Sequence, residues 1–573
     1  MNRCKCFSLL LLSVIFLLGC LLAACAPAQA PTPTPEPIDT LWEGDPIVHT
    51  HCGPVKGFHD ENNTWVWKAI PFAKPPVGEL RWKAPQEPEP WEAIRAETEF
   101  CERCSQPDPI SGKIVGSEDC LYLNVWRPQT EETDLPVYVW IHGGGNSIGS
   151  AVDEMYWGAN LASKSKVVYV SMNYRLGPLG WFTHPALRTG DKEDDSGNYG
   201  TLDIIQALKW VHSNIEGFGG DPHNVTIAGE SAGGINTLSL LLSPLAHGLF
   251  HKAISQSGAA VGMPVKVGEE SAKQVILKLL LNDAVVTDEA EAVKHLESMS
   301  NAEIAAYARS KSYGELHACY ETGSLGFSLL TFPFLFTDGT VIVADGVDAF
   351  ETGTYPNKVP IILGTNKDEM KLFLYFNPAF PDKDGELYQA VAKYTSDLWK
   401  VAGADGLASK VSSHSDQPDV YVYQFLWGSV KDTGESVLPD PFGSHLGAFH
   451  SLDVSFFLGN DYGIEDALAM AGIAIDTKQN RPGRLALQDA ITSYVAQFVR
   501  TGDPATGRPG SNLPRWSSWS NNEGEAKCIL LNARYDAIDI RMSTLELTEA
   551  GIRTEIDTLP ETIAEAIRKA SLF

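Results

Sequence analysis

The stretch Gly229-Glu230-Ser231-Ala232-Gly233 is the part of this sequence from which the fold can be argued. It fits G-x-S-x-G, a pattern in which a serine occupies a sharp turn between a strand and a helix. Residues 224–228 before it are β-prone, and residues 232–242 after it form a small-then-apolar run that favours a helix. Glycines at both flanks leave room for the strained turn, and the helix N-terminus then presents free N–H groups.

A second motif precedes the first by about 90 residues. Residues 137–141 form a continuous apolar run, which is typical of a buried parallel strand. The run ends in His142-Gly143-Gly144-Gly145, where three glycines allow backbone N–H groups to turn toward a ligand. A plain glycine turn is the alternative interpretation. The position of this HGGG-type motif upstream of the serine favours an oxyanion hole instead.

Strand and helix patterns alternate along the rest of the chain. Strands are predicted at residues 167–172, 359–364 and 420–425, and helices at residues 201–215, across 265–325, and near 487–498. Apolar residues spaced four, three and four apart give the first helix one apolar face: Ile204, Leu208, Val211 and Ile215. This alternation predicts an α/β fold with a large, mostly parallel central sheet flanked by helices, and active sites in such sheets lie at the carboxyl ends of the strands.

Composition limits the classes of function. The chain has 573 residues, of which 44% are hydrophobic and 20% charged, as in an ordinary globular protein. Its net charge of −28 argues against nucleic-acid binding, which needs basic patches. No internal repeat or second linker interrupts the sequence, so residues 41–573 are predicted to form a single domain.

The N-terminal residues have the features of a targeting segment. Arg3 and Lys5 precede an apolar stretch over residues 7–22, which is typical of a signal peptide. Leu22-Ala23-Ala24-Cys25 resembles a bacterial lipobox; Cys20 is a poorer candidate for lipidation, and ordinary cleavage near Ala30 is the alternative. We therefore expect a lipoprotein signal peptide (1–25), a Pro/Thr-rich linker (26–40), and an exported cell-envelope protein whose only membrane contact is a lipid on Cys25.

Six cysteines follow the predicted signal peptide: Cys52, Cys101, Cys104, Cys120, Cys319 and Cys528. Export permits disulfides, but six cysteines allow 15 pairings and their spacing selects none of them. Cys101 and Cys104 form a lone C-x-x-C pair without the second pair that a zinc site needs. We expect neither a bound metal nor a cofactor.

Together the motifs resemble the type-B carboxylesterase family, which includes cholinesterases and bacterial para-nitrobenzyl-type esterases. The resemblance spans about residues 46–520 and is carried by residues 118–126, 173–177, 218–234 and 364–369. It implies an α/β-hydrolase fold and a serine hydrolase that cleaves small-molecule carboxylic esters through an acyl-enzyme intermediate.

The resemblance also assigns roles to residues. It implies Ser231 as the nucleophile, Glu369 as the acid and His450 as the base, in the chain order expected of this fold. His445 and Asp368 are the rival residues, and His142 is expected to be structural. The matching oxyanion donors are Gly144, Gly145 and Ala232, and the matching disulfide is Cys104–Cys120.

Several positions depart from the family pattern. Residues 105–119 contain no aromatic residue, which argues against choline specificity. Asn146 replaces the usual aromatic after the glycines and predicts a more polar pocket mouth, while Asp453 replaces a common glutamate and is expected to support the triad. Leu329, Leu330 and Phe332 match the family's acyl pocket, although ordinary core residues are an equally good interpretation.

Two other functions are compatible with these motifs. The family includes cell-surface members that lost the nucleophile, so a catalytically inactive binding module is one alternative. A lipase or amidase built on the same residues is the other. The residues give no basis for predicting the physiological ester or the oligomeric state.

Overall fold

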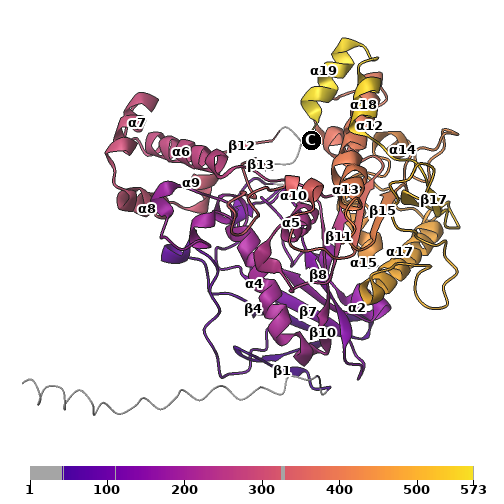
Figure 1. Ribbon diagram of the computed structural model, residues 1–573, viewed down its shortest axis with the longest axis horizontal. Coiled ribbons are helices and arrows are strands. Elements are labelled where there is room, and N and C mark those ends of the chain that lie inside the picture. Colours follow the sequence, from indigo (N-terminus) through magenta and orange to yellow (C-terminus); the bar gives the residue numbers. More distant parts are fainter. Residues whose placement is uncertain (1–41, 43, 110, 324–328, 572–573) are drawn as a thin grey trace, which may run out of the picture. The chain divides into compact units, whose positions relative to one another are not determined.

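The computed structural model describes residues 42, 44–109, 111–323 and 329–571 (Figure 1). These residues belong to one unit, Thr40–Phe573. The predicted signal peptide, Cys25 and the linker 26–40 lie outside the described residues. Among the described helices, none combines the length and hydrophobicity needed to cross a bilayer.

A large sheet runs through the described part of the chain. Its eleven strands follow the order β17 (Arg541–Ser543), β16 (Cys528–Leu531), β15 (Val420–Phe425), β14 (Ile361–Asn366), β11 (Lys252–Gln256), β10 (Gly220–Glu230), β8 (Leu135–Ile141), β9 (Val168–Met172), β7 (Tyr122–Pro128), β4 (Thr64–Pro71) and β3 (Phe58–Asp60). The strands from β16 to β9 are all parallel, and antiparallel strands complete both edges. The predicted mainly parallel α/β sheet is therefore confirmed.

Among the described residues, three two-stranded sheets stand apart from the large one. They pair β1 (Ile47–Thr50) with β2 (Gly53–Lys56), β5 (Gln106–Pro107) with β6 (Ile114–Val115), and β12 (Glu321–Thr322) with β13 (Leu330–Thr331).

Hydrophobic layers cover both faces of the sheet, which explains the continuous apolar strands. In β8, Val137 and Val139 point into one core, and Tyr138 and Trp140 point into the other. One face is covered by α4 (Tyr199–Asn214) and α5 (Ala232–Leu241). The opposite face is covered by α2 (Ala159–Ser165), α15 (Val454–Leu458) and α17 (Arg481–Thr501). Because neither face meets water, the strands need no polar alternation.

Further helices lie beyond these layers (Figure 1). The predicted helical region 265–325 contains α6 (Val265–Asn282), α7 (Glu289–Ser298), α8 (Asn301–Arg309) and α9 (Tyr313–His317). A separate cluster joins α12 (Glu386–Lys400) to α18 (Glu549–Ile556) and α19 (Glu561–Ala570). The sequence patterns did not predict α18 and α19. The smaller helices are α3 (Gly177–Gly180), α10 (Asp348–Thr352), α11 (Lys371–Phe376), α13 (Gly406–Val411), α14 (Phe442–His445) and α16 (Ile464–Met470).

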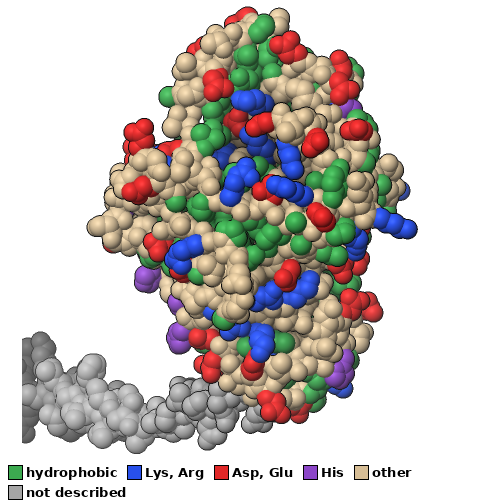
Figure 2. Space-filling view, turned by 90° about the vertical axis from the view of Figure 1, so that its right-hand side faces the viewer, with side chains coloured by type: hydrophobic (Ala, Val, Ile, Leu, Met, Phe, Trp, Pro, Cys, Tyr) green, Lys and Arg blue, Asp and Glu red, His purple; other side chains and the backbone are tan. Residues whose placement is uncertain are grey.

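The net negative charge does not form a uniform acidic surface. On the face drawn in Figure 2, Lys and Arg side chains are interspersed with acidic and apolar ones.

Candidate active site

Ser231 occupies the turn between β10 and α5, at the carboxyl end of the parallel strands. Its backbone has φ 57° and ψ −122°, which is strained for a residue with a side chain. Its N–H donates to the Gln256 carbonyl at 2.8 Å, which holds the turn against the neighbouring strand. A Cβ on Gly233 would lie 2.0 Å from the Ile141 carbonyl oxygen, so only glycine fits there. The predicted strand–turn–helix context of the serine is confirmed.

The HGGG loop lies directly against this turn. A Cβ on Gly143 would come within 3.2 Å of the Ser231 Cβ. Gly144 and Gly145 have φ values of 102° and 61°, which glycine adopts without strain. In the described part of the chain, their N–H groups have no hydrogen-bond acceptor. Ala232 opens α5, where the first N–H groups have no partner within the helix.

Glu369 and His450 form a buried pair in the same region. Glu369 Oε2 lies 2.6 Å from His450 Nδ1, and the two residues are 0% and 4% exposed. A carboxylate can only accept, so Nδ1 carries the shared proton. Glu369 Oε1 accepts from the Ser257 hydroxyl at 2.5 Å and from the Asn366 N–H at 2.7 Å. Both carboxylate oxygens are thus fixed, which orients the imidazole.

A second carboxylate faces the other side of the imidazole. Glu230 Oε1 lies 3.2 Å from His450 Nε2 and accepts from the Ser451 hydroxyl at 2.6 Å. Burial raises the pKa of Glu230 to about 7. Burial alone would lower the pKa of His450, but the carboxylates of Glu230 and Glu369 outweigh it and raise this pKa to about 9.

Asp453 lies behind this group. It accepts from the Tyr423 hydroxyl at 2.5 Å and from the side-chain amides of Asn366 and Gln256, both at 3.2 Å. Burial raises its pKa to about 6. Asn366 also donates its N–H to Glu369, so Asp453 is linked to Glu369 through a shared neighbour.

Sequence reasoning missed Glu230, Ser257 and Ser451 as parts of the site. The signal that could have pointed to Glu230 is its place within G-x-S-x-G, directly before Ser231. No local pattern marks Ser257, which reaches Glu369 from the end of a different strand.

The rival residues lie elsewhere. Asp368 accepts from the Ala448 N–H at 3.0 Å and pairs with Lys371 at 3.0 Å. His445, the last residue of α14, has its Nε2 2.9 Å from Asp384 Oδ1. His142 is 1% exposed and stacks on Tyr174 with ring centroids 4.4 Å apart; burial lowers its pKa to about 4.

Leu329, of the segment that resembles the acyl pocket, lies beside the HGGG loop. A Cβ added to Gly145 would lie 3.3 Å from the Cδ1 atom of Leu329. Leu330 and Phe332 are 7% and 8% exposed and belong to the main core.

The predicted polar role of Asn146 is wrong. This residue is fully buried, and its Oδ1 accepts from the Asn236 amide at 2.9 Å and the Tyr174 hydroxyl at 3.3 Å. A buried amide needs partners, and it finds them in the interior rather than at a pocket mouth. Within the described residues, no group of three or more His, Cys, Asp or Glu side chains is arranged to hold a metal.

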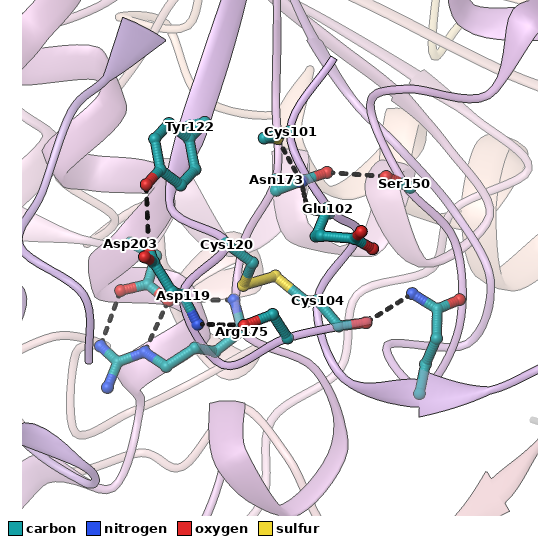
Figure 3. Close-up of a disulfide and its surroundings, with 12 residues drawn as sticks. Cys101, Glu102, Cys104, Asp119, Cys120, Tyr122, Ser150, Asn173, Arg175 and Asp203 are labelled. Atoms are coloured by element: carbon teal, nitrogen blue, oxygen red, sulfur yellow. Dashed lines mark hydrogen bonds and ion pairs between the residues drawn. A yellow bond between two sulfur atoms is a disulfide. The ribbon is translucent and has the colours of Figure 1, made fainter. Parts of the chain in front are cut away.

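The Cys104–Cys120 disulfide is confirmed, with an S–S distance of 2.03 Å (Figure 3). The buried pair of Arg175 and Asp203, with nitrogen and oxygen 2.6 Å apart, lies beside it in the same view. Four cysteines of the described chain are free thiols: Cys52, Cys101, Cys319 and Cys528.

A mostly parallel sheet, a serine at the turn after one central strand, and a Glu–His pair after later strands define an α/β hydrolase. A profile of the carboxylesterase family matches residues 44–385, and this chain belongs to that family. It is a carboxylic ester hydrolase of the serine hydrolase type.

Individual relatives agree with this assignment. The chain is 34% identical to the para-nitrobenzyl esterase of Bacillus subtilis (strain 168), over 80% of this chain and 91% of that protein. It is 32% identical to the liver carboxylesterase of Sus scrofa, over 84% of this chain and 90% of that protein. A solved PNB esterase structure, 31% identical, aligns with a TM-score of 0.63 over 89% of this chain and 99% of its own.

Proposed function

We propose that this protein hydrolyses small carboxylic esters through an acyl-enzyme on Ser231, with His450 as the base and Glu369 as the acid. The observation that carries the proposal is the buried Glu369–His450 pair, with its fixed proton on Nδ1, at the same sheet edge as the strained Ser231 turn. A neutral serine needs a neighbouring base, and His450 Nε2, which Glu230 Oε1 also contacts at 3.2 Å, acts as that base when the imidazole is neutral.

In this mechanism His450 takes the proton of the Ser231 hydroxyl as the oxygen attacks the ester carbonyl. The N–H groups of Gly144, Gly145 and Ala232 stabilise the oxyanion, and each such donor is worth about 10²–10³-fold in rate. His450 then returns the proton to the leaving alcohol, which departs. Water attacks the acyl-enzyme with the same assistance and releases the acid. Glu369 holds the tautomer and stabilises the imidazolium throughout.

We also propose that the enzyme is exported and anchored in the cell envelope by lipidation of Cys25. The support is the tetrad Leu22-Ala23-Ala24-Cys25 at the end of the apolar stretch, followed by a proline-rich linker. Stable anchoring would need more than one acyl chain, because a single chain binds a membrane marginally.

The test combines turnover with labelling. The purified protein is assayed on short para-nitrophenyl esters and treated with a fluorophosphonate, beside Ser231→Ala and a control, Ser298→Ala, at an exposed serine. We expect Ser231→Ala to lose about 10⁶-fold in kcat and all labelling, and the control to keep both.

A folded wild-type protein with neither turnover nor labelling would contradict the proposal and favour the inactive binding module. Parallel assays on para-nitroanilides and on long-chain triacylglycerols separate ester hydrolysis from the amidase and lipase alternatives.

A further inference from the structure

Two aromatic rings lie against His450. The ring centroid of Trp399 is 4.8 Å from that of the imidazole at an interplanar angle of 38°, and that of Phe373 is 5.0 Å away at 42°. The two rings stack on each other with centroids 6.0 Å apart. Trp399 is 4% exposed and lies near the end of α12, far in sequence from the elbow, HGGG and histidine motifs.

Trp399 also contacts Ser257, the residue whose hydroxyl binds Glu369. Its indole N–H donates to the Ser257 carbonyl oxygen at 3.1 Å. The hydroxyl of the same Ser257 donates to Glu369 Oε1 at 2.5 Å. One side chain therefore contacts the base through its ring and, through its N–H, the residue that holds the acid.

A local irregularity of the helix follows this side chain. α12 passes at Lys400 into a π-helical turn, η8 (Val401–Asp405). Such turns are rare and are found frequently at functional sites. A Cβ on Gly403 would lie 2.0 Å from the Gly258 carbonyl oxygen, so the turn packs directly on the backbone that follows Ser257.

A buried ion pair bridges the same turn. Lys400 and Asp405 are 3% and 0% exposed and pair with each other. Asp405 also accepts from the Leu547 N–H at 2.8 Å, which ties the turn to the chain just before α18. The segment that carries the indole is therefore held on its N-terminal side by the packing of α12 and on its C-terminal side by the Lys400–Asp405 pair.

We propose that Trp399 is a positioning residue for His450, whose ring face fixes the imidazole and favours its charged form during the reaction. The inference deepens the proposed serine mechanism and rests on it. Aromatic faces attract cations, and His450 becomes a cation when it takes the proton of Ser231. The carboxylates of Glu369, Glu230 and Asp453 are the charged groups that face the imidazole, and Trp399 adds to their effect.

The test compares Trp399→Phe with Trp399→Met in the full chain. The two new side chains are similar in size, but only phenylalanine keeps a ring against His450. Trp82→Phe and Trp82→Met form the matched control, because Trp82 is also buried, stacks on Phe182 at 4.7 Å and donates to a backbone carbonyl.

We expect Trp399→Met to lower kcat on para-nitrophenyl acetate about tenfold with KM within about twofold, and Trp399→Phe to recover most of that loss. The lower limb of kcat/KM against pH should move to lower pH in Trp399→Met, because the imidazolium loses a stabilising contact. It should move little in Trp399→Phe and not at all in the Trp82 variants.

Equal kcat values and pH profiles in Trp399→Phe and Trp399→Met would overturn the proposal, since Trp399 would then only fill space. That result differs from failure of the serine mechanism, in which the wild-type protein itself would show no turnover or labelling. If Trp399→Met does not fold, a loss of activity in folded Trp399→Phe as large as that expected for the methionine variant would still contradict the role of the ring.

Discussion

At the residue scale, two adjacent carboxylates have different environments. Glu369 accepts a bond from each side of its carboxylate and orients His450, whereas Asp368 is bound by Ser429, Ala448 and Lys371. Both residues lie in the turn that follows β14, and most of the groups that bind their carboxylates come from distant segments of the chain.

This difference predicts that an amide substitution at Glu369 lowers activity, whereas one at Asp368 lowers stability. Glu369→Gln should lower kcat by about 10³–10⁴-fold, because the amide no longer fixes the tautomer or stabilises the imidazolium. Asp368→Asn should lower the melting temperature while kcat stays within about tenfold. Steady-state kinetics with thermal unfolding of both variants checks the assignment, and a larger kcat loss in Asp368→Asn would reverse it.

His450 lies between two carboxylates, and its charge therefore depends on both. The folded-state pKa of about 9 lies above the usual 6.5, so the neutral base becomes more abundant as the pH rises from 7 to 9. We expect kcat/KM to rise over that interval.

Glu230→Gln should move this rise to lower pH, because removing a negative charge beside the imidazole lowers its pKa. The measurement is kcat/KM for a neutral ester from pH 5 to 10. Asp384→Asn is the control, since it removes a carboxylate beside the other histidine, His445. An unchanged profile in Glu230→Gln would contradict the electrostatic role of Glu230.

At the element scale, the loop between Cys104 and Cys120 is closed by the disulfide and contains the short β5–β6 pair. The family resemblance implied this pairing, which cysteine spacing alone did not select. The strand and helix periodicities likewise predicted the positions of β8, β9, β10, β14 and β15, but not α18 and α19. Each of these helices does have an apolar face with i, i+4 spacing, formed by Ile552 and Ile556 in α18 and by Ile563 and Ile567 in α19, and both faces pack in one cluster with α12.

Removal of the disulfide should destabilise the protein without abolishing catalysis. A closed loop of 16 residues contributes about 3 kcal/mol by restricting the unfolded chain. Cys104→Ser/Cys120→Ser should therefore lower the free energy of unfolding by about that amount in urea titrations. Cys52→Ser removes a free thiol and serves as the control; an equal loss there would contradict a specific role of the disulfide.

At the scale of the whole molecule, the site and the start of the described domain lie at opposite ends of the parallel strands. The ring centroid of Trp42 lies 5.9 Å from that of Trp67 and 4.0 Å from the Arg127 guanidinium carbon. Trp42 also lies next to Gly219, the residue directly before β10. Ser231 follows the other end of this strand, roughly 20 Å away, because Gly220 and Gly229 pair with Leu135 and Ile141 of β8, which are six residues apart.

We therefore expect the proposed lipid anchor to determine location but not catalysis. Cys25→Ser should release the enzyme from the membrane fraction while kcat/KM on soluble esters stays unchanged. Cell fractionation and metabolic labelling with a radioactive fatty acid provide the measurement, with Cys20→Ser as the control. Retention of the label in Cys25→Ser would place the lipid elsewhere.

The sequence by itself determined the fold class, the serine turn and the HGGG loop. These features are local, because the steric demands of a turn and the periodic burial of a strand depend on adjacent residues. The roles of Glu369 and His450 came from the family resemblance. Only the tertiary structure decided that Glu230 and Trp399 contact His450, that Ser257 holds Glu369, and that Asn146 turns inward. Those contacts join segments up to about two hundred residues apart, and burial and pKa arise from such packing rather than from any one stretch of chain.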